Sequence, residues 1–100
     1  MTSKIMTVYK LRFKEDADKE WKKLDSTVKS QFKKQLIKHL DNPHVPSAKL
    51  SGMSNCYKIK LRSAGYRLVY EVRDNELIVS VVAVGKRERN AVYKAAMKRI

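Results

Sequence analysis

The sequence predicts one α+β domain, in which helices cover a largely antiparallel sheet, and three observations lead to this prediction. Residues 56–72 (CYKIKLRSAGYRLVYEV) alternate apolar and polar side chains on both sides of a short SAG break, which is typical of a β-hairpin. Residues 77–84 (LIVSVVAV) are apolar at nearly every position, as in a strand buried on both faces. Residues 15–24 and 27–40 repeat apolar side chains at helical spacing. A chain of 100 residues suits one modest core, so we expect residues 1–100 to form a single domain.

The N-terminal part is expected to contain a leader, a strand and two helices. Residues 1–6 are expected to be flexible, and residues 8–13 (VYKLRF) alternate as a strand. The first helix, 15–24, begins with acidic residues, which the helix dipole favours, and Asp25 caps the second helix, 27–40. Joined tightly, the two form an αα-hairpin that covers one face of the sheet. The apolar positions that define their inner sides are Ala17, Trp21, Leu24, Val28, Phe32, Leu36 and Leu40.

The hairpin pattern predicts one apolar face and one basic face. The hairpin follows a long loop at 41–55. A tight turn at Ala64-Gly65 opposes Arg62 to Arg67, Lys60 to Val69 and Lys58 to Glu71. A four-residue loop at 63–66 gives the same pairs. Four like charges on neighbouring pleats repel one another, so a polyanion is the expected partner of this face. The side chains of the basic face are Lys58, Lys60, Arg62 and Arg67.

The C-terminal third is expected to complete the sheet and to add a helix near the basic face. A turn at Asp74-Asn75 opposes Val72 to Leu77 and places the apolar strand, 77–84, at the centre of a four-stranded sheet. Ser80 and Val82 are then expected to lie beside Val69 and Arg67, and Gly85 ends the strand. Residues 89–100 repeat apolar side chains at helical spacing and are expected to form the C-terminal helix.

The charge balance indicates a nucleic-acid partner. Lys and Arg number 23 against 10 Asp and Glu, which gives a net charge of +13. Nucleic acid accounts best for this excess, with an acidic protein or an anionic membrane as lesser alternatives. The single cysteine, Cys56, excludes an internal disulfide, and His39 and His44 offer no metal-ligand spacing with it. The sequence has no run of transmembrane length and no apolar signal core, so we expect the protein in the cytoplasm. We also expect it to bind no metal and no cofactor.

The basic face has the residue types that RNA cleavage by a 2′-hydroxyl requires. Such a reaction needs a group that accepts the hydroxyl proton, cations that hold the scissile phosphate, and stabilisation of the leaving oxygen. Arginine holds phosphate oxygens with two parallel hydrogen bonds. A lysine accepts a proton only if its pKa falls, and crowding by like charges lowers it. From the composition alone, phosphate binding without chemistry is equally well supported.

Several stretches of the chain resemble the RelE toxins of bacterial toxin–antitoxin modules. The resemblance covers residues 8–100 and is carried by WKKLDSTVKSQFKKQL, KLSGM, the hairpin at 56–72 and VSVVAVGKRERNAVYKAAMKRI. It implies a RelE-like fold and a metal-independent endoribonuclease, an mRNA interferase that cleaves mRNA in the A site of the 70S ribosome. It also implies a RelB-like antitoxin, and operator DNA bound only through the toxin–antitoxin complex. The chain departs from the family in a longer leader and in Ser51, where close relatives have arginine.

The resemblance also implies a role for each site residue. Lys58 and Lys60 match the catalytic lysines, with Lys60 as general base and Lys58 as supporting charge. Arg67 and Arg87 match the arginines that stabilise the phosphate and the leaving oxygen, and Tyr93 matches a tyrosine that orients or stacks on a base. The residues expected to contact nucleic acid without performing chemistry are Arg62, Lys86, Arg89, Lys33 and Lys34.

Two alternative functions remain open at this point. The first is a non-enzymatic module that blocks the ribosome or another nucleic-acid machine through its basic face. The second is inhibition of gyrase, since the wider fold family includes gyrase-poisoning toxins. The set of Lys58, Lys60, Arg67, Arg87 and Tyr93 favours RNA cleavage over both.

Overall fold

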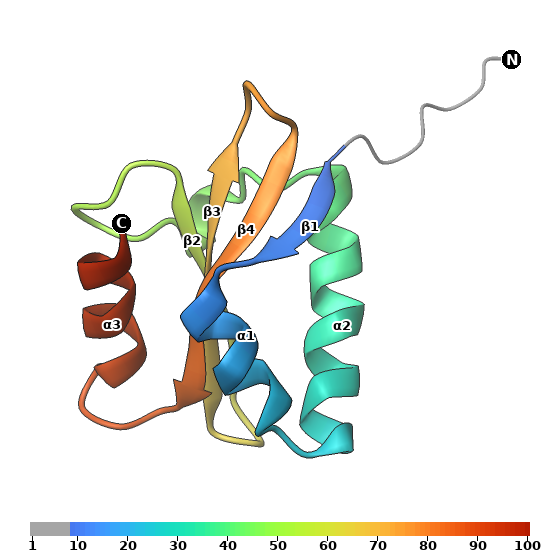
Figure 1. Cartoon of the computed structure of the whole chain (residues 1–100), viewed down its shortest axis with the longest axis vertical. Coiled ribbons are helices and arrows are strands. Elements are labelled where there is room, and N and C mark those ends of the chain that lie inside the picture. Colours follow the sequence, from blue (N-terminus) through green and yellow to red (C-terminus); the bar gives the residue numbers. More distant parts are fainter. Residues whose placement is uncertain (1–8) are drawn as a thin grey trace, which may run out of the picture.

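A four-stranded sheet with the strand order β1-β4-β3-β2 is the centre of the computed structural model (Figure 1), which describes residues 9–100. The short β1 runs parallel to β4, and the other two pairs are antiparallel. The predicted largely antiparallel sheet with a central apolar strand is therefore confirmed. The predicted leader, 1–6, and the first residue of the predicted strand 8–13 lie outside the described residues. The strands are β1 (Lys10–Phe13), β2 (Cys56–Leu61), β3 (Tyr66–Arg73) and β4 (Ile78–Lys86).

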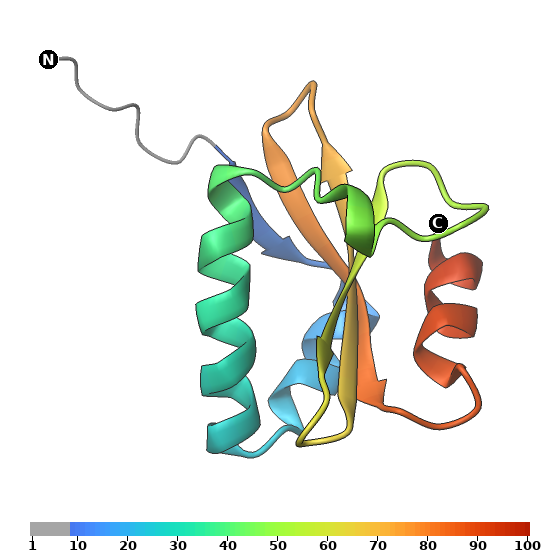
Figure 2. The same cartoon turned by 180° about the vertical axis from the view of Figure 1, so that it is seen from behind.

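Three α-helices cover the two faces of this sheet. The helices α1 (Glu15–Lys22) and α2 (Ser26–Asp41) pack on one face, and α3 (Ala91–Arg99) packs on the other, as Figures 1 and 2 show. Asp25 caps α2, since its carboxylate accepts a hydrogen bond from the N–H of Val28 at 3.0 Å. The predicted αα-hairpin and C-terminal helix are confirmed, although α3 is shorter at both ends than the predicted 89–100. A 3₁₀ turn, Pro46–Ala48, lies within the long loop.

Each face of the sheet has its own apolar cluster. Under α1 and α2, the cluster includes the fully buried Phe32, Leu36 and Tyr70. Under α3, a smaller cluster is formed by buried residues of the sheet and of the helix, and Leu50 and Met53 pack against it from the long loop. The buried members of this second cluster are Cys56, Val69, Val82, Ala83, Val92 and Ala96.

The register of the β2–β3 hairpin differs from the prediction by two residues. Lys60 lies opposite Arg67, whereas the predicted turn opposed Arg62 to Arg67. The connection is a four-residue loop that begins at Arg62 and ends at Gly65, whose φ of +71° lies in the region that glycine tolerates best. The N–H of Gly65 closes this loop by donating to the carbonyl of Leu61 at 2.8 Å. Because a shift of two keeps each side chain on its face, the basic face survives, but Arg62 moves from the strand into the loop.

The register between β3 and β4 was also predicted wrongly. Val72 lies opposite Val79 rather than Leu77, because the connection is a four-residue loop and not a two-residue turn. Ser80 lies opposite Glu71 rather than beside Val69. The prediction failed because alternation fixes the face of each side chain but not the length of a loop.

A β-bulge further changes the pairing of β4. Val69 lies opposite Ala83 and Tyr70 opposite Val81, so Val82 is the extra residue on β4. Val82 and Ala83 then both belong to the cluster under α3. Beyond the bulge, β4 continues to Lys86, whereas the prediction ended this strand at Gly85.

The two histidines contact tyrosines of the sheet, His39 from α2 and His44 from the long loop. Tyr70 donates its hydroxyl proton to the carbonyl of Pro43 at 2.8 Å, so the 2.9 Å contact with His39 requires Nδ1–H of His39 as the donor. His44 contacts the Tyr57 hydroxyl through Nδ1 at 2.9 Å and the carboxylate of Asp74 through Nε2 at 2.8 Å. Both histidines therefore have hydrogen-bond partners within the fold.

Candidate functional site

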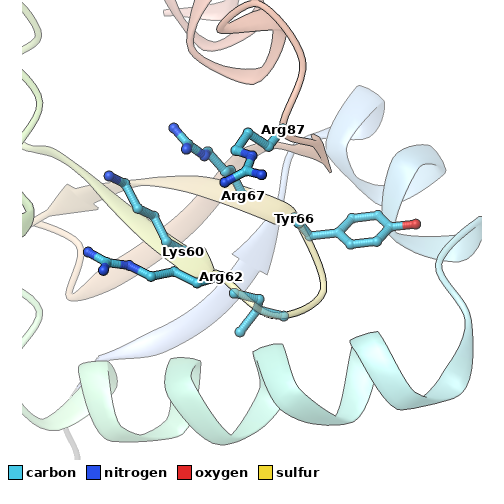
Figure 3. Close-up of a pocket in the computed structure, with 7 residues that line it drawn as sticks. Lys60, Arg62, Tyr66, Arg67 and Arg87 are labelled. Carbon is cyan, nitrogen blue, oxygen red and sulfur yellow. The ribbon is translucent and has the colours of Figure 1, made fainter.

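Two loops meet at one end of the sheet and enclose a cationic pocket of about 230 Å³. Lys60 projects from the end of β2 and lies opposite Arg67 at the start of β3. The backbone N–H of Arg87 donates to the carbonyl of Gly65 at 2.7 Å, which holds the loop after β4 against the hairpin loop. In Figure 3 the side chains of Lys60, Arg67 and Arg87 gather on one side, while the ring of Tyr66 points away from them. The pocket is lined by Lys60, Leu61, Arg62, Gly65, Tyr66, Arg67 and Arg87.

Tyr93 joins this pocket through Arg67. The Nη1 of Arg67 donates to the Tyr93 hydroxyl at 3.0 Å, and its guanidinium carbon lies 5.5 Å from the centre of the Tyr93 ring. That distance is within the range of a cation–π interaction. The two contacts fix the direction of the Arg67 guanidinium, and they place an aromatic ring from α3 beside the cations of the sheet.

Lys60 is the lysine whose proton is easiest to lose in this group. The positive charges of Lys58 and Arg67, followed by smaller effects of partial desolvation, Arg62 and Arg87, lower the pKa of Lys60 below its ordinary value. Its side chain is nevertheless exposed, so its amine is accessible to a substrate. The structure therefore supplies the condition that a lysine base requires, which is a lowered pKa at an open position.

Within residues 9–100, the cations that line the pocket and the nearby Lys58 make no salt bridge. The cations that line it are Lys60, Arg62, Arg67 and Arg87. A group of unpaired cations around a small pocket is suited to an anion with several oxygen atoms, and a phosphate diester has this chemistry. The arrangement also keeps competing carboxylates away from the amine of Lys60.

The residues predicted to contact nucleic acid are distributed unevenly. Arg62 lines the pocket, and Lys86 lines a small hollow between the pocket and Tyr93. Lys34 lines a second groove, which Arg62 also lines, whereas Lys33 does not line it. Arg89 is exposed in the loop before α3, with a φ of +46°. The structure thus gathers the predicted residues near the pocket except for Lys33 and Arg89, which line neither the pocket nor the groove. The site formed by these two hollows therefore does not include Lys33 or Arg89.

The sequence-based search predicted Lys34 of α2 but missed the other residues that line its groove. Gln31 and Gln35 line the same groove as Lys34, and Ser63 lines it from the hairpin loop. The spacing i, i+3, i+4 of the three α2 residues signals a shared helix face. Nothing in the sequence indicates that this face meets the hairpin loop, because the contact depends on how α2 packs against the sheet.

Other candidate sites gain no support from the described part of the chain. Cys56 is fully buried, and burial raises the pKa of its thiol to about 11, so it is not an activated nucleophile. Within residues 9–100, no three side chains of the types His, Cys, Asp and Glu are grouped to hold a metal ion. None of the helices in that range is long and apolar enough to cross a membrane.

Comparison with known proteins assigns the chain to a family. Residues 11–91 match the family described as the ParE toxin of type II toxin–antitoxin systems, parDE. The mRNA interferase toxin RelE of Escherichia coli K12 is 58% identical over 92 residues, which cover 92% of this chain and 97% of that protein.

Solved structures of E. coli RelE are similar in fold as well as in sequence. The crystal structure of the isolated toxin has a TM-score of 0.79 and 56% identity, with 91% of this chain and 97% of that chain covered. The toxin chain in the crystal structure of the intact E. coli RelBE toxin–antitoxin complex has a TM-score of 0.78 and 57% identity, with 81% of this chain and 99% of that chain covered. This chain therefore belongs to the RelE/ParE family of toxins from type II toxin–antitoxin systems.

Proposed function

We propose that this protein is an mRNA interferase, an endoribonuclease that cleaves mRNA in the A site of the 70S ribosome and thereby inhibits translation. The observation that supports it most directly is the unpaired cationic pocket around Lys60, an exposed lysine whose pKa is lowered by its neighbours. The name of the E. coli relative, an mRNA interferase, supports the same reaction class. Gyrase inhibition has no comparable support from the pocket.

In the proposed reaction, Lys60 takes the proton from the 2′-hydroxyl of the nucleotide before the scissile phosphate. The 2′-oxygen forms a bond to phosphorus, and the bond between phosphorus and the 5′-oxygen of the next nucleotide breaks. The leaving 5′-oxygen takes a proton from water, so the products are a 2′,3′-cyclic phosphate and a 5′-hydroxyl. Both the base and the stabilising charges are side chains, so the proposed mechanism needs no metal or cofactor.

The remaining residues of the site have distinct roles in this proposal. Arg67 binds the phosphate oxygens, in a direction set by its bond to Tyr93. Arg87 stabilises the negative charge on the leaving 5′-oxygen, because a guanidinium is too weak an acid to be an efficient proton donor. Lys58 lowers the pKa of Lys60. Tyr93 stacks on or orients a base that is displaced from its neighbours.

The proposed partners follow from the family. A RelB-like antitoxin neutralises the toxin, and the toxin–antitoxin complex represses its own operon by binding operator DNA. The substrate is mRNA held by the ribosome, which places the active protein in the cytoplasm.

Mapping of mRNA 5′ ends tests the proposal. Primer extension in a reconstituted translation reaction, with and without ribosomes, compares the wild type with Lys60→Ala. We expect cuts within the A-site codon that require ribosomes and disappear in Lys60→Ala, while a control variant, Lys33→Ala, still cuts. Stalled translation with intact mRNA would instead identify a non-enzymatic ribosome blocker. Normal translation together with inhibited DNA supercoiling would identify a gyrase inhibitor.

A further inference from the structure

A second cationic groove of about 430 Å³ lies between α2 and the hairpin loop, beside the pocket. In Figure 3, α2 runs next to the loop that carries Arg62. The groove therefore has one wall from a helix and one wall from the hairpin. Its lining residues are Gln31, Lys34, Gln35, Lys60, Leu61, Arg62 and Ser63.

This groove is continuous with the pocket. Lys60, Leu61 and Arg62 line both of them, so the two hollows share one wall. A strand whose phosphate occupies the pocket has nucleotides on both sides of that phosphate. One of these sides faces Arg87 and Tyr93, and the other faces the groove.

The chemistry of the groove suits single-stranded RNA. Lys34, Lys60 and Arg62 are cations, and the lining contains no carboxylate. The amides of Gln31 and Gln35 are able both to donate and to accept hydrogen bonds, as the edges of unpaired bases require. Leu61 adds an apolar surface for a base.

We propose that this groove binds the nucleotides of the mRNA that adjoin the scissile phosphate, and that Gln31 and Gln35 contribute to codon preference. The inference rests on the proposed function and adds a substrate subsite to it. Messenger RNA is favoured over ribosomal RNA because the groove shares its wall with the pocket. The nucleotides covalently joined to the scissile phosphate are therefore the nearest RNA.

Cross-linking identifies the strand that occupies the groove. The native Cys56 is fully buried with a raised thiol pKa, so in Gln35→Cys the introduced thiol is the reactive one. A thiol-linked aryl azide on Gln35→Cys is activated on ribosomes whose A-site codon carries 2′-O-methyl groups, which block the attack. We expect cross-links to mRNA within or next to that codon. Lys33→Cys, on the same helix but outside the groove, is the control and should not mark those nucleotides.

Kinetics on ribosomes provide a second, independent measurement. Lys34→Gln and Lys33→Gln remove the same charge from neighbouring positions, but only Lys34 lines the groove. We expect Lys34→Gln to raise KM about five- to tenfold with little change in kcat, since it removes a binding contact away from the reacting atoms. Lys33→Gln should stay within about twofold of the wild type.

The double variant Gln31→Ala/Gln35→Ala tests the role in codon preference. We expect it to keep cleaving but to redistribute its cuts among codons. Cross-links from Gln35→Cys that fall only on ribosomal RNA would overturn the inference. Equal KM values for the two lysine variants, or an unchanged codon distribution in the glutamine variant, would also overturn it. In each of these cases the wild type still cuts mRNA, so the result is distinct from a failure of the proposed function.

Discussion

Arginine serves opposite purposes in two regions of this molecule. At the end of α3, Arg99 donates to both carboxylate oxygens of Glu20 at 2.9 Å and to the carbonyl of Val82 at 2.9 Å. The same carboxylate accepts the N–H of Val84 at 3.1 Å, so the pair joins α3, α1 and β4. In the pocket, by contrast, Arg67 and Arg87 form no salt bridge with any carboxylate of residues 9–100.

The two arginine environments shift the pKa of a neighbouring group, Glu20 in one and Lys60 in the other, for different reasons. Burial alone would raise the pKa of Glu20, but the hydrogen bonds from Arg99 and Val84 outweigh it and hold the pKa below its ordinary value. Lys60, surrounded by like charges, has its pKa lowered by repulsion. Paired arginines thus stabilise the fold, whereas the unpaired cations keep their binding capacity for a phosphate.

The largest expected effect comes from removing an unpaired arginine. Arg67→Ala should lower the cleavage rate by about 10²–10³, the usual effect of losing one donor to a developing negative charge. The free energy of unfolding should change little, since Arg67 has no acidic partner to leave behind. Single-turnover cleavage on ribosomes and urea unfolding measure the two effects. A large loss of stability in Arg67→Ala with normal cleavage would contradict the distinction between the unpaired Arg67 and the paired Arg99.

Removing the paired arginine should reverse this outcome. Arg99→Ala should lower the free energy of unfolding by about 1.5–3 kcal/mol, the range for hydrogen bonds to charged groups. Its neighbour Lys98 is exposed, so Lys98→Ala is the matched control and should stay within about 0.5 kcal/mol of the wild type. Urea unfolding of both variants checks the difference, and equal stabilities would show that the Arg99–Glu20 pair contributes no net stability.

The crowding of cations predicts a shift in the pH dependence of cleavage. The neutral amine of Lys60 is the base, so the rate rises as pH rises through the Lys60 pKa. Lys58→Ala removes the largest cause of the lowered pKa, so the rising limb should move to higher pH. The midpoint of the rising limb, measured over the widest pH range that the ribosome tolerates, gives the shift. An unmoved midpoint in Lys58→Ala would show that Lys60 is not the titrating base.

A smaller effect is expected from His39 on the apolar side of the sheet. Burial, with a lesser contribution from Lys38, lowers the pKa of His39 below its ordinary 6.5. Protonation therefore favours the unfolded state, and stability should decrease as pH falls below about 6.5. His39→Asn should flatten this decrease in urea unfolding, while also losing the contact with Tyr70. An unchanged slope would assign the pH dependence to other groups.

Much of the architecture was predictable because its signals are local. Alternation identified the hairpin, the apolar run identified the central β4, and Asp25 marked the start of α2. The face that carries Lys58 and Lys60 was predictable for the same reason, since the period of a strand is two. Loop lengths were not predictable, and both hairpin registers were consequently wrong by two residues. The bulge at Val82 has no signal in the sequence.

The sequence by itself determined the elements, the basic face and the residue types that RNA cleavage requires, because side-chain periodicity and charge are properties of neighbouring residues. Only the tertiary structure decided which cations meet. Arg87 lines the same pocket as Lys60 because its N–H binds the carbonyl of Gly65. Gln31 and Gln35 line the adjoining groove because α2 packs beside the hairpin loop. These contacts join segments far apart in the chain, and their geometry depends on loop lengths and packing that no local pattern records.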